Sequence, residues 1–149
     1  MIWKPHVTVA AVIEQDGKFL LVEEHTEAGP QFNQPAGHWE PDETLAEGVA
    51  REVLEETAYH FVPEALLGIY RWRHPAKDVT YLRFAFCGRL DGHESGRALD
   101  TGIIRAAWFS PEEIRATAGR HRSPLIVKCM EDYLAGKRYP LEIISHLAK

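Results

Sequence analysis

Three glutamates that lie within five residues of one another are the clearest candidates for chemistry. Glu52, Glu55 and Glu56 stand at positions i, i+3 and i+4, so on a helix their carboxylates would meet on one patch. Three adjacent negative charges repel, and a hard divalent cation such as Mg²⁺ binds oxygen donors of this kind. Such a cation, together with one free carboxylate as a base, could activate water for attack on phosphorus. The alternative is that the glutamates are merely solvated, as most surface carboxylates are.

Two neighbours on the same segment bear on these alternatives. Arg51 supplies one positive charge, but on a helical wheel it projects to the far side of Glu55 and is not expected to neutralise all three glutamates. Gly48 falls between Glu52 and Glu55 on the wheel, and an interior glycine costs a helix about 1 kcal/mol relative to alanine. Gly48 either leaves a bare patch for a hydrated ion and a phosphate, or is a tolerated weak spot.

The helix that would carry these residues is expected from Thr44 to Thr57. Thr44 and Glu47 have the spacing of a capping box, which defines the helix start. The apolar side chains fall on one half of this helix: Leu45, Ala46, Val49, Ala50, Val53 and Leu54. Glu56 lies at the edge of that half, where a lone carboxylate would be partly desolvated and would need a cation.

The remaining sequence predicts strands interleaved with helices. Residues 6–13 and 18–23 are apolar and are joined by Gln15-Asp16-Gly17, so we expect them to pair as a hairpin, followed by a polar loop at 24–31. Further strands are expected at 65–73, 79–90 and 103–109, and further helices are expected to begin at Ser110 and Ser123 and to end at Gly119 and Gly136. This pattern predicts an α/β fold of mixed α+β type, with a mixed sheet covered by helices.

The composition of residues 1–149 is that of a single globular domain, with 45% hydrophobic and 26% charged residues. The net charge of −5 and the scattered cations argue against a nucleic-acid polymer and favour a small-molecule partner. No stretch has the length of a membrane span, and the N-terminus lacks a signal-peptide pattern, so we expect a cytoplasmic protein without a membrane partner. Cys87 and Cys129 form no CxxC pair and are expected to be reduced structural thiols.

The segment from Gly37 to Tyr59 resembles the Nudix box, a motif whose fixed spacing is highly specific. The matching residues are Gly37, Glu43, Arg51, Glu52, Val53, Glu55 and Glu56. The departure is Ala58, where the family usually has glycine; a left-handed alanine at a helix end costs about 1 kcal/mol. The family resemblance extends over most of the chain, and Phe-Asn-Gln-Pro-Ala-Gly-His is similar to the NudJ-type phosphatases within the family.

The resemblance implies a Nudix-type α/β/α sandwich and gives roles to the residues of the box. The implied ligands of Mg²⁺, or of Mn²⁺ in its place, are Glu52, Glu56, Glu55 and the backbone carbonyl of Gly37. Glu55 would be either a further ligand or the catalytic base. Arg51 would orient the glutamates, and Glu43 would pair with Arg51 as a structural brace.

The resemblance also implies hydrolysis of a phosphoanhydride bond in a small organic diphosphate or triphosphate. The substrates would be nucleoside di- or triphosphates or the diphosphate of hydroxymethylpyrimidine. We expect direct attack by water, because the box holds no Ser, Cys or His in a nucleophile-and-base arrangement. The alternatives are a dinucleotide-polyphosphate or nucleotide-sugar pyrophosphatase, and a non-catalytic ligand-sensing domain. The intact glutamates favour catalysis.

Alternating aromatic and cationic residues at 70–73 give a second set of candidates. Trp72 could stack on a ring of the substrate while Arg71 and Arg73 contact its phosphates. The alternative is a strand with one aromatic face in the core and one charged face in water. His38, beside Gly37, is a further candidate for a phosphate contact. The sequence is compatible with a monomer or a homodimer.

Overall fold

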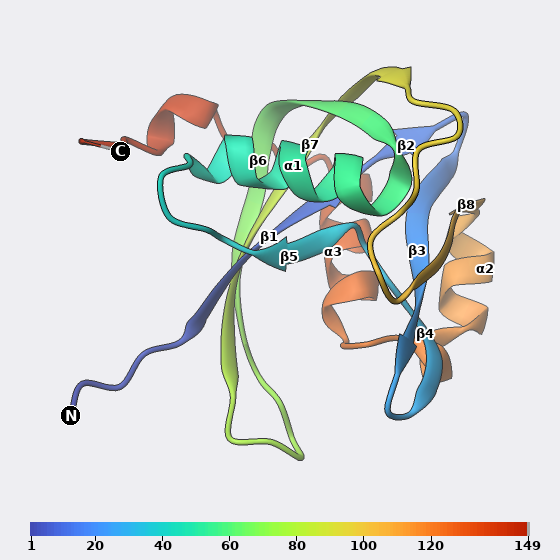
Figure 1. The fold of residues 1–149 in the computed structure, drawn as a ribbon, viewed down its shortest axis with the longest axis horizontal. Coiled ribbons are helices and arrows are strands. Elements are labelled where there is room, and N and C mark those ends of the chain that lie inside the picture. The colour runs from blue at the N-terminus through green and yellow to red at the C-terminus, as the bar shows by residue number, and fades with distance from the viewer. Residues whose placement is uncertain (149) are drawn as a thin grey trace.

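A computed structural model describes residues 1–148, which form two four-stranded sheets and three α-helices (Figure 1). The first sheet has the strand order β5-β1-β7-β6, and in the second β3 pairs with β2, β4 and β8. The strands are β1 His6–Val12, β2 Glu14–Gln15, β3 Lys18–Thr26, β4 Gly29–Asn33, β5 Ala36–His38, β6 Tyr59–Arg73, β7 Thr80–His93 and β8 Ile103–Phe109. The helices are α1 Leu45–Thr57, α2 Pro111–Ala116 and α3 Leu125–Leu134, with 3₁₀ turns at Ala118–Arg120 and Leu141–Ile143.

Strand β1 lies in the middle of the first sheet and makes that sheet mixed. It runs parallel to β7 and antiparallel to β5. Residues Val9 to Val12 are at most 2% exposed, because one side of the strand faces α1 and the other faces α3 and the second sheet. Strands β6 and β7 form a long antiparallel hairpin whose tip extends beyond the rest of the molecule (Figure 1).

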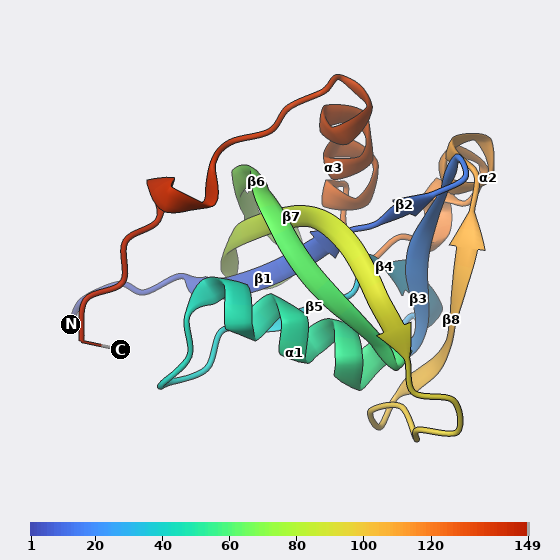
Figure 2. The same ribbon diagram turned by 90° about the horizontal axis from the view of Figure 1, so that it is seen from above.

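Helices cover the two faces of the first sheet (Figure 2). Helix α1 packs on one face through a cluster that includes Val49, Val53, Val9, Ala11 and Phe86. Helix α3 and the second sheet pack on the other face through a cluster that includes Ile126, Met130, Phe32, Val12 and Leu67. The predicted α/β fold, a mixed sheet between helices, is confirmed.

The predicted hairpin between residues 6–13 and 18–23 forms only next to its turn. There the two-residue β2 pairs with β3 through Glu14↔Phe19 and Gln15↔Lys18, and the Leu20 amide donates to the Ile13 carbonyl at 2.9 Å. Strand β1 itself pairs with β5 and β7 and not with β3. The turn predicted at Gln15-Asp16-Gly17 is present, with positive φ at Asp16 and Gly17. The chain thus passes from one sheet to the other at this turn, because the apolar β1 gains more by being buried in the centre of the first sheet.

The predicted polar loop at 24–31 is also wrong. Strand β3 continues to Thr26 and turns into β4 at Gly29, where the backbone φ is +90°. The charged side chains there predicted a loop, but Glu23 pairs with Arg105 and Arg120, and Glu24 pairs with Arg122. Long-range ion pairs therefore hold polar residues on these strands.

The helices begin where the capping signals predict. Thr44 accepts a hydrogen bond from the Glu47 amide and donates its own amide to the Glu47 carboxylate, at 3.1 and 2.8 Å. Ser110 and Glu113 form the same box at the start of α2. Helix α3 begins after Pro124. The predicted end at Gly119 falls in the 3₁₀ turn after α2.

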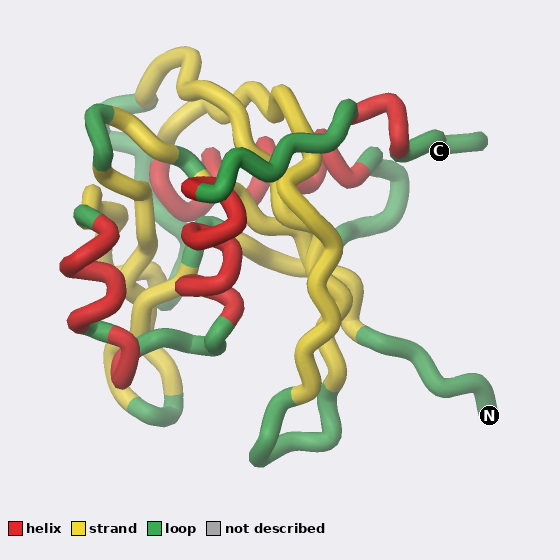
Figure 3. Tube along the Cα trace, turned by 180° about the vertical axis from the view of Figure 1, so that it is seen from behind, coloured by secondary structure: helices red, strands yellow, loops and turns green. Residues whose placement is uncertain are grey.

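The C-terminal segment after α3 crosses the first sheet near its β6 edge (Figure 3). Leu66 and Tyr139 exchange two backbone hydrogen bonds of 2.9 and 2.8 Å, which extends the pairing of β6 beyond β7. His146 then accepts a hydrogen bond from the Leu45 amide at the start of α1. Over residues 1–148, no helix is long and apolar enough to cross a membrane.

Candidate metal and substrate site

Strand β5 passes so close to α1 that a side chain at residue 37 would displace the Glu52 carboxylate. A β-carbon built on Gly37 would collide with the carboxylate of Glu52. The backbone amide of the preceding residue, Ala36, donates a 3.1 Å hydrogen bond to Oε1 of Glu56. Strand β5 and the acidic face of α1 therefore form one unit, in which the carboxylates of Glu52 and Glu56 lie against the backbone of β5.

Glu52 and Glu56 are buried carboxyls, 8% and 7% exposed. Burial raises the pKa of Glu56 to about 9; the Ala36 amide opposes this shift, and the charges of Glu52 and Glu24 reinforce it. Burial also raises the pKa of Glu52, although the Arg51 guanidinium opposes that shift. Two buried carboxyls side by side destabilise each other's charged form, and a hard divalent cation would relieve both the repulsion and the loss of hydration.

The helical wheel predicts that Arg51 projects away from the other glutamates, and this prediction is wrong. Its Nη1 atom lies 2.8 Å from Glu52 Oε1 and 3.0 Å from Glu55 Oε1, so the guanidinium bridges these two carboxylates. Its Nε and Nη2 atoms each donate a 2.9 Å hydrogen bond to Glu43, which confirms the predicted pairing of Arg51 with Glu43. Nη2 also donates to the carbonyl of His38 at 3.1 Å. Arg51 thus ties the loop before α1 to the glutamates.

The fit of this unit to a metal ion follows from its donors. Within residues 1–148 no three acidic, histidine or cysteine side chains are already gathered as a cage, because Glu55 turns toward Arg51. The donors that remain for a metal ion are the buried carboxylates of Glu52 and Glu56 and the backbone of β5 against them. These oxygen donors carry negative charge that the surrounding residues do not fully compensate. Mg²⁺ and Mn²⁺ bind such donors, so the residues present fit an ion of this kind.

The space beside Gly48 is not left open for an ion and a phosphate. A β-carbon there would lie 2.8 Å from Glu43 Oε1 and 3.5 Å from Trp39 Cδ1. Trp39 is held over the helix by a 2.9 Å hydrogen bond from its indole nitrogen to the Glu43 carbonyl. Gly48 is therefore needed for the close packing of the loop before α1, which corrects both interpretations made from the sequence.

The end of α1 has the geometry that the departure from the Nudix box predicts. Ala58 adopts a left-handed conformation, with φ 66° and ψ 7°, and its amide donates to the Leu54 carbonyl at 3.0 Å. Ala58 is 3% exposed, so it closes the helix inside the protein. An alanine in this conformation is strained, because its β-carbon crowds the backbone where glycine would not.

A cleft of about 990 Å³ opens beside β5. Ala36, Gly37 and His38 form part of its lining. Glu52 and Glu56 contact this strand but are not themselves among the lining residues. His38 also contacts His6 at 3.2 Å, and burial together with the charge of His6 lowers the pKa of His38, which favours its neutral form.

One of the three candidates on β6 lies in this cleft. Trp72 lines it and stacks on Tyr81 of β7, with ring centroids 5.9 Å apart and an interplanar angle of 16°. Arg71 and Arg73 are exposed and are not among the lining residues, and Arg73 lies 3.5 Å from Asp78 near the hairpin tip. The alternating strand therefore turns Trp72 toward the cleft and its arginines toward water, while Tyr70 is buried against Asp132.

The cleft contains polar residues that reasoning from the sequence missed. Arg83 of β7 lies on its floor, 5% exposed, and donates hydrogen bonds to Gln34 and Asn33. Arg122 lines the cleft as well and pairs with Glu24 at 3.0 Å. Arg83 interrupts the apolar run 79–90, and a cation in such a run is a signal that could have found it.

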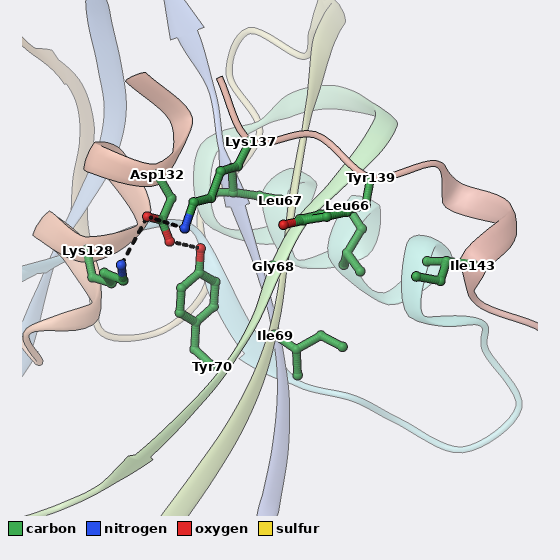
Figure 4. Close-up of a pocket in the computed structure, with 10 residues that line it drawn as sticks. All are labelled: Leu66, Leu67, Gly68, Ile69, Tyr70, Lys128, Asp132, Lys137, Tyr139 and Ile143. Atoms are coloured by element: carbon green, nitrogen blue, oxygen red, sulfur yellow. Dashed lines mark hydrogen bonds and ion pairs between the residues drawn. The ribbon is translucent and has the colours of Figure 1, made fainter. Parts of the chain in front are cut away.

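A second hollow, of about 410 Å³, lies on the β6 side of the molecule, away from the glutamates (Figure 4). The Tyr70 hydroxyl donates to Asp132 at 2.8 Å, and Lys128 and Lys137 approach the other oxygen of Asp132 at 3.1 and 3.4 Å. Two lysines share one aspartate in this hollow, so its charged side chains contact one another and one positive charge remains. The cleft beside β5 is larger and is lined by the strand that contacts Glu52 and Glu56, so it is the better candidate for binding a charged substrate.

Comparison with known proteins agrees with this geometry. A model of the NUDIX domain matches residues 4–129 of the chain. The chain belongs to the Nudix family. The resemblance read from the box is therefore confirmed, and the protein is a Nudix hydrolase, an enzyme that acts on phosphoanhydride bonds.

Relatives within the Nudix family cover nearly the whole chain. Phosphatase NudJ of Escherichia coli K12 is 43% identical over 143 residues, which are 96% of this chain and 92% of that protein. The structure of a NUDIX hydrolase from Nitrosomonas europaea is 56% identical with a TM-score of 0.94, and the match covers 97% of this chain and 98% of that one. The MutT protein from Methanosarcina mazei Go1 is 27% identical with a TM-score of 0.67, and the match covers 93% and 100% of the two chains.

Proposed function

We propose that this Nudix hydrolase cleaves small organic diphosphates or triphosphates, with Mg²⁺ held by Glu52 and Glu56. The observation that carries the proposal is the buried pair of carboxyls against the backbone of β5, a strand that lines a large cleft. Mn²⁺ would fit the same oxygen donors. When bound, the metal ion supplies positive charge that offsets the charge of the phosphates and lowers the pKa of a bound water.

The residues of the chain have separate tasks in this proposal. Glu52, Glu56 and the Gly37 carbonyl hold the ion, and Glu55 is a further ligand or the base that accepts a proton from the attacking water. Arg51 is a positioning residue, because it fixes Glu52 and Glu55 and is itself fixed by Glu43. Water attacks phosphorus directly, with no covalent intermediate. The proposed substrates are nucleoside di- and triphosphates and hydroxymethylpyrimidine diphosphate. A phosphatase activity is supported by the 43% identity to a relative named Phosphatase NudJ.

A phosphate-release screen tests this proposal. Nucleoside diphosphates, nucleoside triphosphates, sugar nucleotides, dinucleotide polyphosphates and pyrimidine diphosphates would be incubated with Mg²⁺, and orthophosphate and pyrophosphate would be measured separately. We expect turnover of a di- or triphosphate, and a loss of about a hundredfold or more in Glu56→Gln, because one oxygen ligand is replaced by a neutral amide. Preference for sugar nucleotides or dinucleotide polyphosphates would favour the alternative substrates instead.

The matched control is Glu131→Gln, which makes the same change at an exposed position on α3. It should keep full activity. Binding of Mn²⁺ measured by calorimetry gives a readout that does not depend on turnover: Glu56→Gln should lose it and Glu131→Gln should retain it. Full activity or unchanged metal affinity in folded Glu56→Gln would overturn the assignment of Glu56.

A further inference from the structure

Arg83 is a buried cation with no anionic partner among residues 1–148. Its hydrogen bonds run to neutral acceptors: Nη1 donates to Gln34 Oε1 at 2.9 Å and Nη2 donates to Asn33 Oδ1 at 3.2 Å. Its Nε atom is buried and has no hydrogen-bond partner within residues 1–148. A buried charge is normally paired with an opposite charge, and an unmade hydrogen bond is costly. This arginine therefore keeps both charge and donor capacity that the folded chain does not use.

The guanidinium is held in a fixed orientation. Gln34 is 3% exposed, and its amide nitrogen donates a 2.9 Å hydrogen bond to the Ile126 carbonyl, which turns its oxygen toward Arg83. Cys129 Sγ lies 3.9 Å from the same Nη1 atom. These contacts occupy Nη1, and Asn33 takes one N–H of Nη2, so the N–H of Nε and the second N–H of Nη2 are the donors left for a ligand. Two N–H groups on one guanidinium edge match two neighbouring acceptors in one plane.

In the first sheet, Arg83 lies between the aromatic pair Trp72 and Tyr81 on one side and strand β5 on the other. Tyr81 is two residues earlier on the same face of β7 and stacks on Trp72. In the other direction, Arg83 is in register with Thr8 of β1, which is in register with His38 of β5. Two strand spacings separate the backbones of β7 and β5 by about 10 Å, and the Arg83 guanidinium contacts the segment just before β5. Arg83 lines the same cleft as Trp72 and Tyr81.

We propose that Arg83 determines substrate specificity by donating two hydrogen bonds to adjacent acceptors on the edge of a flat heteroaromatic ring that packs against Trp72. The proposal rests on the proposed function, since it places the diphosphate of the same ligand at the glutamates. Guanine presents such a pair at O6 and N7, and cytosine presents one at O2 and N3. Adenine places an amino donor beside N7 and would face the arginine with a donor against a donor.

Equilibrium binding in EDTA tests this without any turnover. GDP, CDP, ADP and inorganic pyrophosphate would be titrated into the wild-type protein and into Arg83→Gln, with dissociation constants taken from calorimetry. The wild type should bind GDP or CDP at least tenfold more tightly than ADP. In Arg83→Gln the affinity for GDP and CDP should fall roughly tenfold to a hundredfold, the range for a bidentate arginine–base contact, while pyrophosphate changes less than twofold.

Two further variants keep the result interpretable. Arg89→Gln changes an exposed arginine of the same strand and should alter none of the four constants. Arg83→Lys retains the charge but lacks the planar pair of donors, so it should lose the preference over ADP even where Arg83→Gln fails to fold. Circular dichroism would establish that each variant is folded.

Three results would overturn the proposal. The first is a wild type that does not distinguish GDP and CDP from ADP, and the second is an equal loss of pyrophosphate affinity in Arg83→Gln, which would make Arg83 a phosphate site. The third is a folded Arg83→Gln with unchanged constants, which would leave the arginine a purely structural role. If ring specificity depends on Arg83 but no ligand is hydrolysed with Mg²⁺, this proposal stands and the proposed function fails.

Discussion

The carboxylate of Glu52 occupies the space that a β-carbon on residue 37 would need, so Gly37 and Glu52 are neighbours only because residue 37 has no side chain. Replacing Gly37 by Ala should push Glu52 out of its place. A displacement of about 1 Å at a reacting centre costs about a hundredfold in rate, and we expect a loss of that order in kcat. Steady-state kinetics with the best substrate from the phosphate-release screen would measure it.

The control for this change is Gly119→Ala. A β-carbon there meets nothing within 4 Å, and its backbone has no positive φ that would strain an alanine. This variant should keep wild-type kcat and stability. A fully active Gly37→Ala protein would show that the close approach of β5 to α1 has no part in catalysis.

Gly48→Ala should harm the protein although helix propensity predicts the opposite. An alanine inside an exposed helix gains about 1 kcal/mol over glycine. Here the new methyl group would lie 2.8 Å from Glu43 Oε1, which is held by Arg51 and the Glu40 amide. We expect that gain in the free energy of unfolding to be absent and kcat to fall, because Arg51 loses its brace. Urea unfolding together with kinetics would test this, and a more stable, fully active variant would contradict it.

Ala58→Gly should stabilise the protein by about 1 kcal/mol, because Ala58 is left-handed and glycine adopts this conformation without strain. Activity should not change, since no proposed metal ligand is altered. The midpoint of urea unfolding measures the effect. Ala135→Gly is the matched control: Ala135 ends α3 with φ −74°, so glycine brings no relief there and should not stabilise. An equal gain in both variants would argue against strain at Ala58.

The sequence predicts α1 and its acidic face well because their signals are local. Thr44 and Glu47 define the helix start, and the i, i+4 spacing places Arg51 beside Glu55. The wheel failed for Arg51 because it gives the direction of the Cα–Cβ bond, whereas a long side chain can turn back toward its neighbours.

Strand pairing and the floor of the cleft depend on contacts far apart in sequence. Strand β1 pairs with β7, more than seventy residues away, and the hairpin signal after β1 says nothing about this partner. Arg83 donates its hydrogen bonds to the segment before β5, at a separation of about fifty residues. The alternation at 70–73 predicted two faces, but only the tertiary fold showed that Trp72 borders the cleft and that Tyr70 bonds to Asp132.

The pH dependence of stability should reflect Asp132, a residue of α3 whose side chain is 9% exposed. Burial opposes ionisation, but hydrogen bonds from Tyr70, Lys128 and Lys137 outweigh it and lower the pKa of Asp132 below its usual 3.8. A carboxyl with a lowered folded-state pKa stabilises the protein above its unfolded-state pKa and loses that contribution as the pH falls through the folded-state value. The contribution should therefore be complete at neutral pH and decline below about pH 4.

Asp132→Asn should lower the free energy of unfolding by about 1–3 kcal/mol at pH 7, the range for losing hydrogen bonds to a charged group. Its deficit relative to the wild type should shrink as the pH falls below 4, because the wild type then loses the same interaction. Urea unfolding at pH 7, 5 and 3 measures both effects. Asp91→Asn, at an exposed position on β7, should show neither. A deficit that stays constant down to pH 3 would mean that the charge of Asp132 contributes nothing, and that only its packing against Tyr70 does.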